Sequence, residues 1–332
     1  MFIFSESGNT MNINVSEVIE LPRTARKKSE GSIFHIMIRS ISEVNLFRTN
    51  KDKVVYLNLI KKYQCLYHFK IYAYCLMDNH AHLVIDVNGA DISRIMHCAD
   101  FSYARYFNKA YKRHGHLFQD RFKSKIVNSD RYLRVVTGYI HKNPVDLPGY
   151  NSNPEKYSFS SLPVFLGMQK DPSGLLDQNF INSFFRLNVK RSNDEMAISQ
   201  ADYLKFVNSC NDPGMKDVID FSGEHSEYVS NNTPLIRNFD SSLVISYVSE
   251  KTGIDSFMIY AKNNRTSHKP RAIAAFLLRS LCNCRCADIC RILGNITQSM
   301  ASSLTRTGLD LVLGSSFYKE IVDEFITTYS SA

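Results

Sequence analysis

The sequence predicts an α+β fold, in which an antiparallel sheet covered by helices is followed by a small all-α part. Apolar and polar side chains alternate around Phe34 and Ile36, as they do in a half-buried strand. Residues 91–113 and 131–142 show helical spacing instead, and this spacing returns after Ser241. With 332 residues, of which 44% are hydrophobic and 12% aromatic, the chain can bury a sizeable core, so a wholly disordered chain is excluded.

The elements of the first part follow in the order strand, helix, strand, strand, helix, strand, helix. This order is typical of the split-βαβ arrangement. Asp78 and Asn79 form a tight turn between two strands, while Asp91 and Asp130 cap the two later helices. The last helix ends before Pro144, because the residue preceding a proline disfavours helical geometry. The expected strands are 32–40, 69–77, 80–87 and 116–127, and the expected helices are 51–63, 91–113 and 131–142.

Composition divides the chain into four parts. Residues 1–20 are a polar lead-in, and residues 21–165 form the α+β domain. Residues 166–240 are predicted to be a partly helical connector, because they contain the turn-forming sequences Asn-Asp-Pro-Gly and Asn-Asn-Thr-Pro. Residues 241–332 form the all-helical domain.

The charge balance favours an anionic partner. The chain carries 40 Lys and Arg against 32 Asp and Glu, a net charge of +8. No apolar run approaches the roughly 18 residues that cross a bilayer, so an integral membrane protein is not expected. The N-terminus lacks the pattern of a secretory signal, and the eight cysteines are then most simply reduced thiols in the cytoplasm.

His80 and His82 are the first candidate site. Side chains alternate along a strand, so both imidazoles share one face and could bind one divalent metal. Two surface or hydrogen-bonded histidines remain the alternative.

Tyr139 and Asn143 are the second candidate site, because residues i and i+4 project from the same side of a helix. A phenol can attack phosphorus as a nucleophile, and a carboxamide oxygen can complete a metal shell. The alternative is a packing tyrosine followed by a helix-terminating Asn-Pro.

Between these sites lies a basic and aromatic segment, residues 105–125, which has the composition of a single-strand binding surface. Cations would contact phosphates, and the interleaved rings would stack on bases. A solvated helix face with core aromatics is the alternative. The candidate contacts are Arg105, Lys112, Arg113, Arg121 and Lys123, with Arg23, Arg26 and Lys27 of an earlier basic run.

These motifs together resemble the single-tyrosine HUH transposases, and most closely the REP-associated tyrosine transposases of bacteria. The resemblance rests on CLMDNHAHLVI, YARYFNKAYKRHGHLFQDRFKS, DRYLRVVTGYIHKNPV and EKYSFSSL, and it covers residues 20–165. It implies a ferredoxin-like HUH domain in which His80, His82 and Asn143 bind Mg2+ or Mn2+ and Tyr139 is the nucleophile. Two histidine ligands alone would not exclude Zn2+. Relatives often carry Gln at the position of Asn143.

The implied activity is cleavage and rejoining of single-stranded DNA near hairpin-forming repeats through a 5′-phosphotyrosine intermediate. A free phenol has a pKa near 10, so activation would come mainly from the metal. The rival function is a domesticated protein that binds such hairpins without cutting them. An RNA-hairpin partner stays open, and related enzymes include both monomers and homodimers.

Residues 271–306 resemble the helix-turn-helix end of bacterial replication initiators. Asn295-Ile296-Thr297 stands where initiators carry a basic element that reads bases, so no target sequence carries over. Gln298, Ser299 and Ser302 could still face a major groove, and a packing or dimerisation module is the alternative. Nearby cysteines are spaced C-x-C-x-C-x3-C, which favours free thiols over a zinc site; they are Cys282, Cys284, Cys286 and Cys290.

Overall fold

The structure is a computed structural model. It describes residues 32–42, 44–186, 199–210, 239–261, 264–294 and 296–329, together with residues 235 and 237. None of the helices in these ranges is long and apolar enough to cross a membrane.

A four-stranded antiparallel sheet forms the centre of the first part, in the strand order β2-β3-β1-β4. Its register places His82 of β3 opposite Met37 of β1, and Met37 in turn opposite Lys123 of β4. Residues that lie opposite one another on neighbouring strands share a face of the sheet, so the side chains of His82, Met37 and Lys123 lie on the same face. The strands are β1 (Ile33–Arg39), β2 (Lys70–Leu76), β3 (His80–Asp86) and β4 (Lys123–Ile126).

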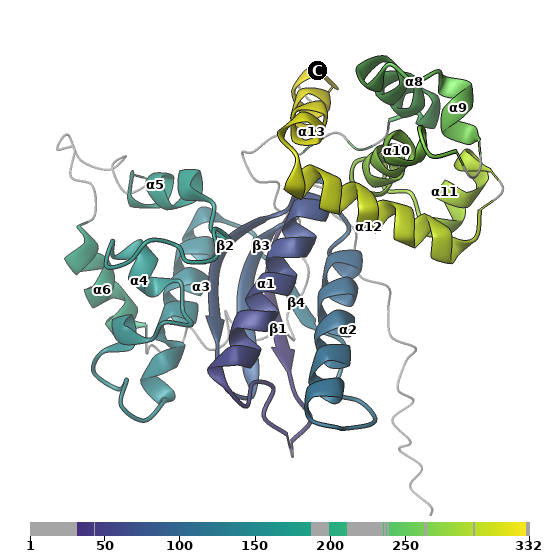
Figure 1. Cartoon of the computed structure of the whole chain (residues 1–332). Coiled ribbons are helices and arrows are strands. Elements are labelled where there is room, and N and C mark those ends of the chain that lie inside the picture. Colours follow the sequence, from purple (N-terminus) through teal and green to yellow (C-terminus); the bar gives the residue numbers. More distant parts are fainter. Residues whose placement is uncertain are drawn as a thin grey trace, which may run out of the picture.

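Helices α1 (Asn50–Tyr67) and α2 (Ile92–Ala110) pack side by side on one face of the sheet, in front of it in Figure 1. Helix α3 (Asp130–Lys142) packs against β2 and β3, with the ring of Tyr139 against the opposite face. The predicted α+β fold is confirmed, and its strand order is that of the split-βαβ arrangement.

Two local predictions differ from the structure. Residues 116–122 do not continue β4, because beyond Met37 this edge of β1 is met only by the single bridge between Ser40 and Phe118. They form a loop instead. Helix α3 is capped by the Ser129 side chain, which accepts from the backbone N–H of Tyr132, and Asp130 is the first helical residue.

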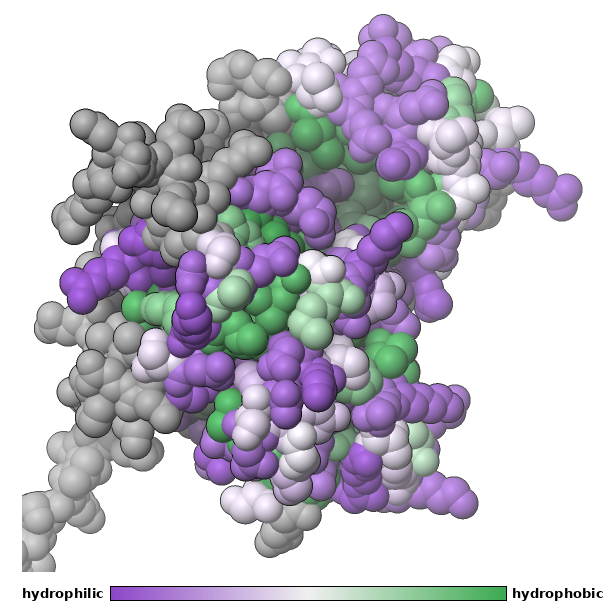
Figure 2. Space-filling view, turned by 90° about the vertical axis from the view of Figure 1, so that its left-hand side faces the viewer, coloured by the Kyte–Doolittle hydropathy of each residue, from purple (hydrophilic) through white to green (hydrophobic). Residues whose placement is uncertain are grey.

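Short elements follow α3 and lie beside it. They are η1 (Asn143–Asp146), η2 (Pro154–Lys156), α4 (Leu162–Phe165), α5 (Gln178–Arg186) and α6 (Gln200–Ser209). Viewed from this side, the surface mixes apolar and hydrophilic residues (Figure 2). Such a mixture is ordinary, since more than half of a protein's accessible surface is apolar.

The C-terminal part is helical and is built around α10, whose residues 270–278 are all buried. Gly308 allows α12 to approach α10 closely, because a Cβ at this position would lie 2.3 Å from the carbonyl oxygen of Ala272. Only glycine fits such an approach without movement of the backbone. The helices are α8 (Ser241–Thr252), α9 (Ser256–Tyr260), α10 (His268–Ser280), α11 (Cys286–Leu293), α12 (Gln298–Gly314) and α13 (Ser316–Tyr329).

Arg237 joins the two parts. Its buried guanidinium donates to the carbonyl oxygens of Tyr67 at the end of α1, Asn88 after β3, and Ser280 at the end of α10. The Arg94 side chain of α2 donates a further hydrogen bond between the two parts, to the carbonyl oxygen of Asn283. The helical part is therefore held against the sheet part at the ends of α1 and α2.

Candidate active site and nucleic-acid interface

The His80–His82 pair lies at the start of β3, on the face of the sheet that α3 covers. The two imidazole rings are 5.1 Å apart at their centroids and nearly perpendicular. His82 is buried, whereas His80 is half-buried near the end of the sheet. The predicted sharing of one face is confirmed by the register of β3 against both neighbours.

Tyr139 and Asn143 reach this pair from the last turn of α3. The Tyr139 ring contacts His82 edge-on, with centroids 5.5 Å apart. The Asn143 side chain donates to the carbonyl oxygen of Tyr139 (2.8 Å), and its Oδ1 lies 3.4 Å from Nε2 of His80. The structure thus brings together the four residues that the sequence predicted as one site.

A buried network holds α3 in this position. His141 is fully buried, with one ring nitrogen 2.7 Å from the hydroxyl of Tyr203 and the other 2.7 Å from the hydroxyl of Ser161. Ser161 also accepts from the backbone N–H of Tyr74 in β2. These hydrogen bonds connect α3 to α6 and to the sheet, and they therefore fix the position of Tyr139 relative to His80 and His82.

The electrostatics of the site favour neutral imidazoles and a protonated phenol. Burial lowers the pKa of His80, and burial together with the neighbouring His35 and His80 lowers that of His82 well below its usual value. Burial, and then the charge of Asp146, raises the pKa of Tyr139. At neutral pH each histidine is therefore uncharged and has a lone pair that can bind a cation. The phenol of Tyr139 stays protonated unless another group stabilises its anion.

The donor atoms fit a divalent cation. Nδ1 of His80 lies 2.6 Å from Oδ1 of Asn79, and Nε2 lies 3.4 Å from Oδ1 of Asn143. Both oxygens only accept and a neutral imidazole carries one proton, so the shorter contact assigns the proton to Nδ1 and leaves Nε2 a lone pair. Oδ1 of Asn143 is a second acceptor facing that lone pair, and a cation would satisfy both. Within the ranges the structure describes, no group of three or more His, Cys, Asp or Glu side chains is arranged to hold a metal.

Two residues of this site were missed by the sequence analysis. His35 of β1 is fully buried, and its Nε2 lies 3.0 Å from Nδ1 of His82. Arg39 is exposed opposite His80, and its charge helps to lower the pKa of His80. Alternation along 33–39 puts both residues on one strand face, but only the register shows that this is the face of the histidine pair.

A basic groove of about 1250 Å³ lies on the α2 side of the sheet. One wall is a helical stripe of α2, and the other is the loop that precedes β4. Phe101 stands exposed in this groove, stacked on His97 and approached by the guanidinium of Arg105. The groove is lined by Ser93, His97, Asp100, Phe101, Ala104, Arg105, Asn108, Lys109, Arg113, His114, Gly115, His116, Leu117, Phe118, Gln119, Asp120, Arg121, Phe122 and Ile41.

The predicted basic segment is divided by the fold. Arg105, Arg113 and Arg121 line the groove, whereas Lys112 is exposed outside its lining. Lys123 is exposed on β4, on the same sheet face as Met37 and His82. The earlier Arg23, Arg26 and Lys27 lie outside the described residues.

Four aromatic rings in this segment or next to it make contacts within the protein. Tyr103 and Phe107 are fully buried in the core. Tyr106 and Tyr111 donate their hydroxyls to Asp52 in the first turn of α1. Phe118 and Phe122 line the groove, but the exposed ring there is Phe101, which the sequence analysis did not single out.

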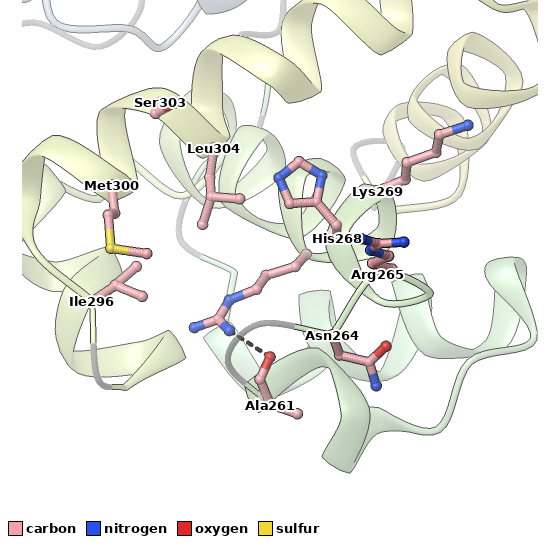
Figure 3. Close-up of a pocket in the computed structure, with 10 residues that line it drawn as sticks. Ala261, Asn264, Arg265, His268, Lys269, Ile296, Met300, Ser303 and Leu304 are labelled. Atoms are coloured by element: carbon pink, nitrogen blue, oxygen red, sulfur yellow. Dashed lines mark hydrogen bonds between the residues drawn. The ribbon is translucent and has the colours of Figure 1, made fainter.

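A second cavity, of about 590 Å³, lies in the helical part between the start of α10 and α12. Figure 3 shows Arg265, His268 and Lys269 on one side of it and Met300, Ser303 and Leu304 of α12 on the other. Arg271 donates to the carbonyl oxygen of Ala261 at its base (2.7 Å). Gln298, Ser299 and Ser302 are exposed on the first turns of α12.

Helix α11 ends at Leu293, and α12 begins at Gln298. The helix-turn-helix assignment itself stays a prediction. All four cysteines before and within α11 are free thiols.

Residues 28–143 match the family model described as "Transposase IS200 like". The matched span contains His80, His82, Tyr139 and Asn143. Among solved structures, one described as "the REP associates tyrosine transposase bound to a REP hairpin" is similar, with 17% identity and a TM-score of 0.38, over 46% of this chain and 90% of the other. No curated protein matches the sequence.

Proposed function

We propose that this protein cleaves and rejoins single-stranded DNA beside hairpin-forming repeats, with Tyr139 as the nucleophile. The observation that carries the proposal is the meeting of Tyr139, His82, His80 and Asn143 at one end of the sheet, from two elements far apart in the sequence. The family match over residues 28–143 supports the same reaction class.

In the proposed reaction the phenolic oxygen of Tyr139 attacks the scissile phosphorus. An oxygen–phosphorus bond forms to Tyr139, the bond to the 3′ oxygen breaks, and the proton lost by the phenol is balanced by the one gained at the 3′ oxygen. The 5′-phosphotyrosine conserves the phosphodiester energy, so a 3′ hydroxyl can reverse the step without ATP.

His80, His82 and Asn143 would hold Mg2+ or Mn2+. A divalent cation there would supply charge stabilisation to the phosphate and to the leaving oxygen. The chain itself contributes neutral imidazoles, because burial lowers the pKa of both histidines. It also holds the phenol ring of Tyr139 edge-on against His82.

The DNA would contact both faces of the sheet part. The basic groove lies on the α2 side, whereas Tyr139 lies on the other side, so a bound strand must pass around the edge of the sheet. Among the described residues β4 is an outermost strand of the sheet, and its Lys123 is exposed and faces the histidine side. The groove would bind phosphates through its arginines and an unpaired base on Phe101.

The helical part would provide a second contact with DNA. Arg265 and Lys269 place positive charge beside the exposed first turn of α12, where Gln298, Ser299 and Ser302 can reach base edges. A partner duplex, such as the stem of the hairpin, would suit this surface.

A covalent adduct tests the proposal directly. Hairpin-flanked single-stranded DNA, incubated with the protein and Mg2+ or Mn2+, should give an adduct that survives denaturation. The label should stay on the protein when it lies 3′ of the nick. Tyr139→Phe removes one oxygen and should lose the adduct while it still binds the hairpin.

Tyr132 provides the matched control on the same helix. It is buried, and its hydroxyl has no hydrogen-bond partner among the residues that the structure describes, so Tyr132→Phe should cost no stability and remain active. An adduct that persists in Tyr139→Phe would identify another nucleophile. No adduct from wild type with either metal, across a panel of hairpins, would favour a protein that binds without cutting.

A salt titration on DNA and RNA hairpins of equal length distinguishes the nucleic acid. We expect tighter binding to DNA at every salt concentration. Tighter binding to RNA would instead indicate recognition of the 2′-hydroxyls.

A further inference from the structure

His35 is a buried polar residue in the middle of β1, and the reaction described above does not use it. It is fully buried, and its ring stacks on that of His82 with centroids 5.1 Å apart and planes inclined by 28°. Its Nε2 lies 3.0 Å from Nδ1 of His82. Burial of a polar side chain costs free energy unless it is hydrogen-bonded, and an apolar residue would fill this space without that cost. We therefore expect the contact between His35 and His82 to have a function other than packing.

The hydrogen bond between His35 and His82 contains one proton, and the ring that donates it decides which nitrogen of His82 has a lone pair for a metal. If His82 donates from Nδ1, its Nε2 keeps a lone pair. If His35 donates instead, the proton of His82 must sit on Nε2, and His82 offers no lone pair to a metal. Both rings are buried, at 0% and 2% exposure, where a charged imidazole is strongly disfavoured, so each ring carries a single proton.

His80 shows the same arrangement with a different partner. Its Nδ1 donates to Oδ1 of Asn79, which leaves Nε2 towards Asn143. Both histidines of the pair thus have a neighbour at Nδ1, one exposed and one buried. Such partners are the usual means by which proteins set the tautomer and orientation of a histidine ligand.

We propose that His35 is a positioning residue, which accepts a hydrogen bond from Nδ1–H of His82 and keeps His82 in the tautomer whose Nε2 can bind the divalent metal. This proposal rests on the proposed function, because the tautomer of His82 matters only if His82 binds the metal. It adds a buried residue of another strand to the site, contributed from outside the His-x-His motif.

The tautomer of His82 can be measured without metal or DNA. In 15N-histidine-labelled protein, long-range 1H–15N spectra show which ring nitrogen carries the proton, and His82→Gln identifies the signal. We expect Nδ1–H for His82 in wild type. In His35→Leu, which fills the space without an acceptor, the proton should move to Nε2, and in His35→Gln the amide oxygen should restore Nδ1–H.

The affinity for Mn2+, followed by electron paramagnetic resonance of the free ion, gives a second readout. We expect His35→Leu to bind Mn2+ about 10- to 100-fold more weakly and His35→Gln to bind close to wild type. His68→Asn is the control, because His68 is half-buried and contacts Phe276 instead of His82, and asparagine tolerates its positive φ of 52°. It should bind Mn2+ as wild type does.

The outcomes separate this proposal from the proposed function. A wild-type His82 protonated on Nε2 overturns the positioning role, whether or not the protein cuts DNA. Unchanged Mn2+ affinity in a folded His35→Leu overturns it too. The expected tautomers with no covalent adduct would support the positioning role and count against the nuclease instead.

Discussion

The side-chain amide of Asn143 donates to the backbone carbonyl of Tyr139, one helical turn earlier and 2.8 Å away. Because the nitrogen is used in this bond, the oxygen of the same amide points to His80. The end of α3 therefore presents the proposed nucleophile and a proposed ligand together, and Pro144 follows immediately beyond them.

Loss of either histidine of the pair should abolish cleavage and spare binding. His80→Ala and His82→Ala remove donors for the metal, but phosphate contacts elsewhere dominate affinity for DNA. Adduct formation should fall below detection, while a gel-shift assay shows hairpin affinity close to wild type. If binding falls together with cleavage, the pair is structural.

Removal of the groove arginines should reduce the salt dependence of binding. Arg105→Ala, Arg113→Ala and Arg121→Ala together should lower the slope of log K against log salt by about 2, at roughly 0.7 for each single-strand phosphate contact. Lys205→Ala is the control, because this lysine is highly exposed on α6, far from the groove lining. An unchanged slope would show that the groove is not the binding surface.

The exposed first turn of α12 should contribute specificity for duplex DNA. Replacement of Gln298, Ser299 or Ser302 by Ala should weaken binding to hairpins with long stems by about 1–3 kcal/mol for each lost base contact. Binding to short unpaired strands should not change. Lys319→Ala on α13 is the control, and equal affinities for all of these variants would favour a packing role for the helical part.

Arg237 should be essential for attachment of the helical part. Arg237→Met keeps the length of the side chain but leaves the carbonyl oxygens of Tyr67, Asn88 and Ser280 without their donor. Hydrogen bonds to a charged group contribute about 1.5–3 kcal/mol each, so the free energy of unfolding should fall by at least about 3 kcal/mol.

Urea unfolding measures this loss, and we expect two transitions in place of one. Arg291→Met is the control, since its side chain is 80% exposed and pairs only locally with Asp288. A single transition at the wild-type midpoint would show that Arg237 does not attach the helical part to the sheet part.

Acid should destabilise the fold below pH 6.5. Burial lowers the pKa of His35 and His141 to about 3 and that of His68 to about 4. The unfolded chain therefore takes up these protons first as pH falls, so their contribution to stability is present above pH 6.5 and is lost towards pH 3–4.

Each such histidine contributes a slope of at most about 1.4 kcal/mol per pH unit. The free energy of unfolding, measured in urea from pH 7 to pH 5, should fall less steeply in His141→Gln than in wild type. His114→Gln, at an exposed position, should leave the slope unchanged. Equal slopes in wild type and His141→Gln would contradict the assignment.

Local patterns in the sequence determined the elements and much of the site. Alternation placed His80 and His82 on one face, and helical spacing placed Tyr139 and Asn143 on one side, since both periods are set by backbone geometry alone. The order of strands and helices was enough to predict the α+β sheet. The family resemblance then joined the two motifs into one centre.

Tertiary structure alone decided what surrounds these motifs. His35 contacts His82 because β1 and β3 pair in one register, and pairing between strands 47 residues apart leaves no local signal. Equally, periodicity cannot distinguish a ring that stacks on DNA from a ring that fills the core. The buried Tyr103 and the exposed Phe101 are two residues apart on one helix, and only the packing of α2 against α1 and the sheet decided which of them faces the groove.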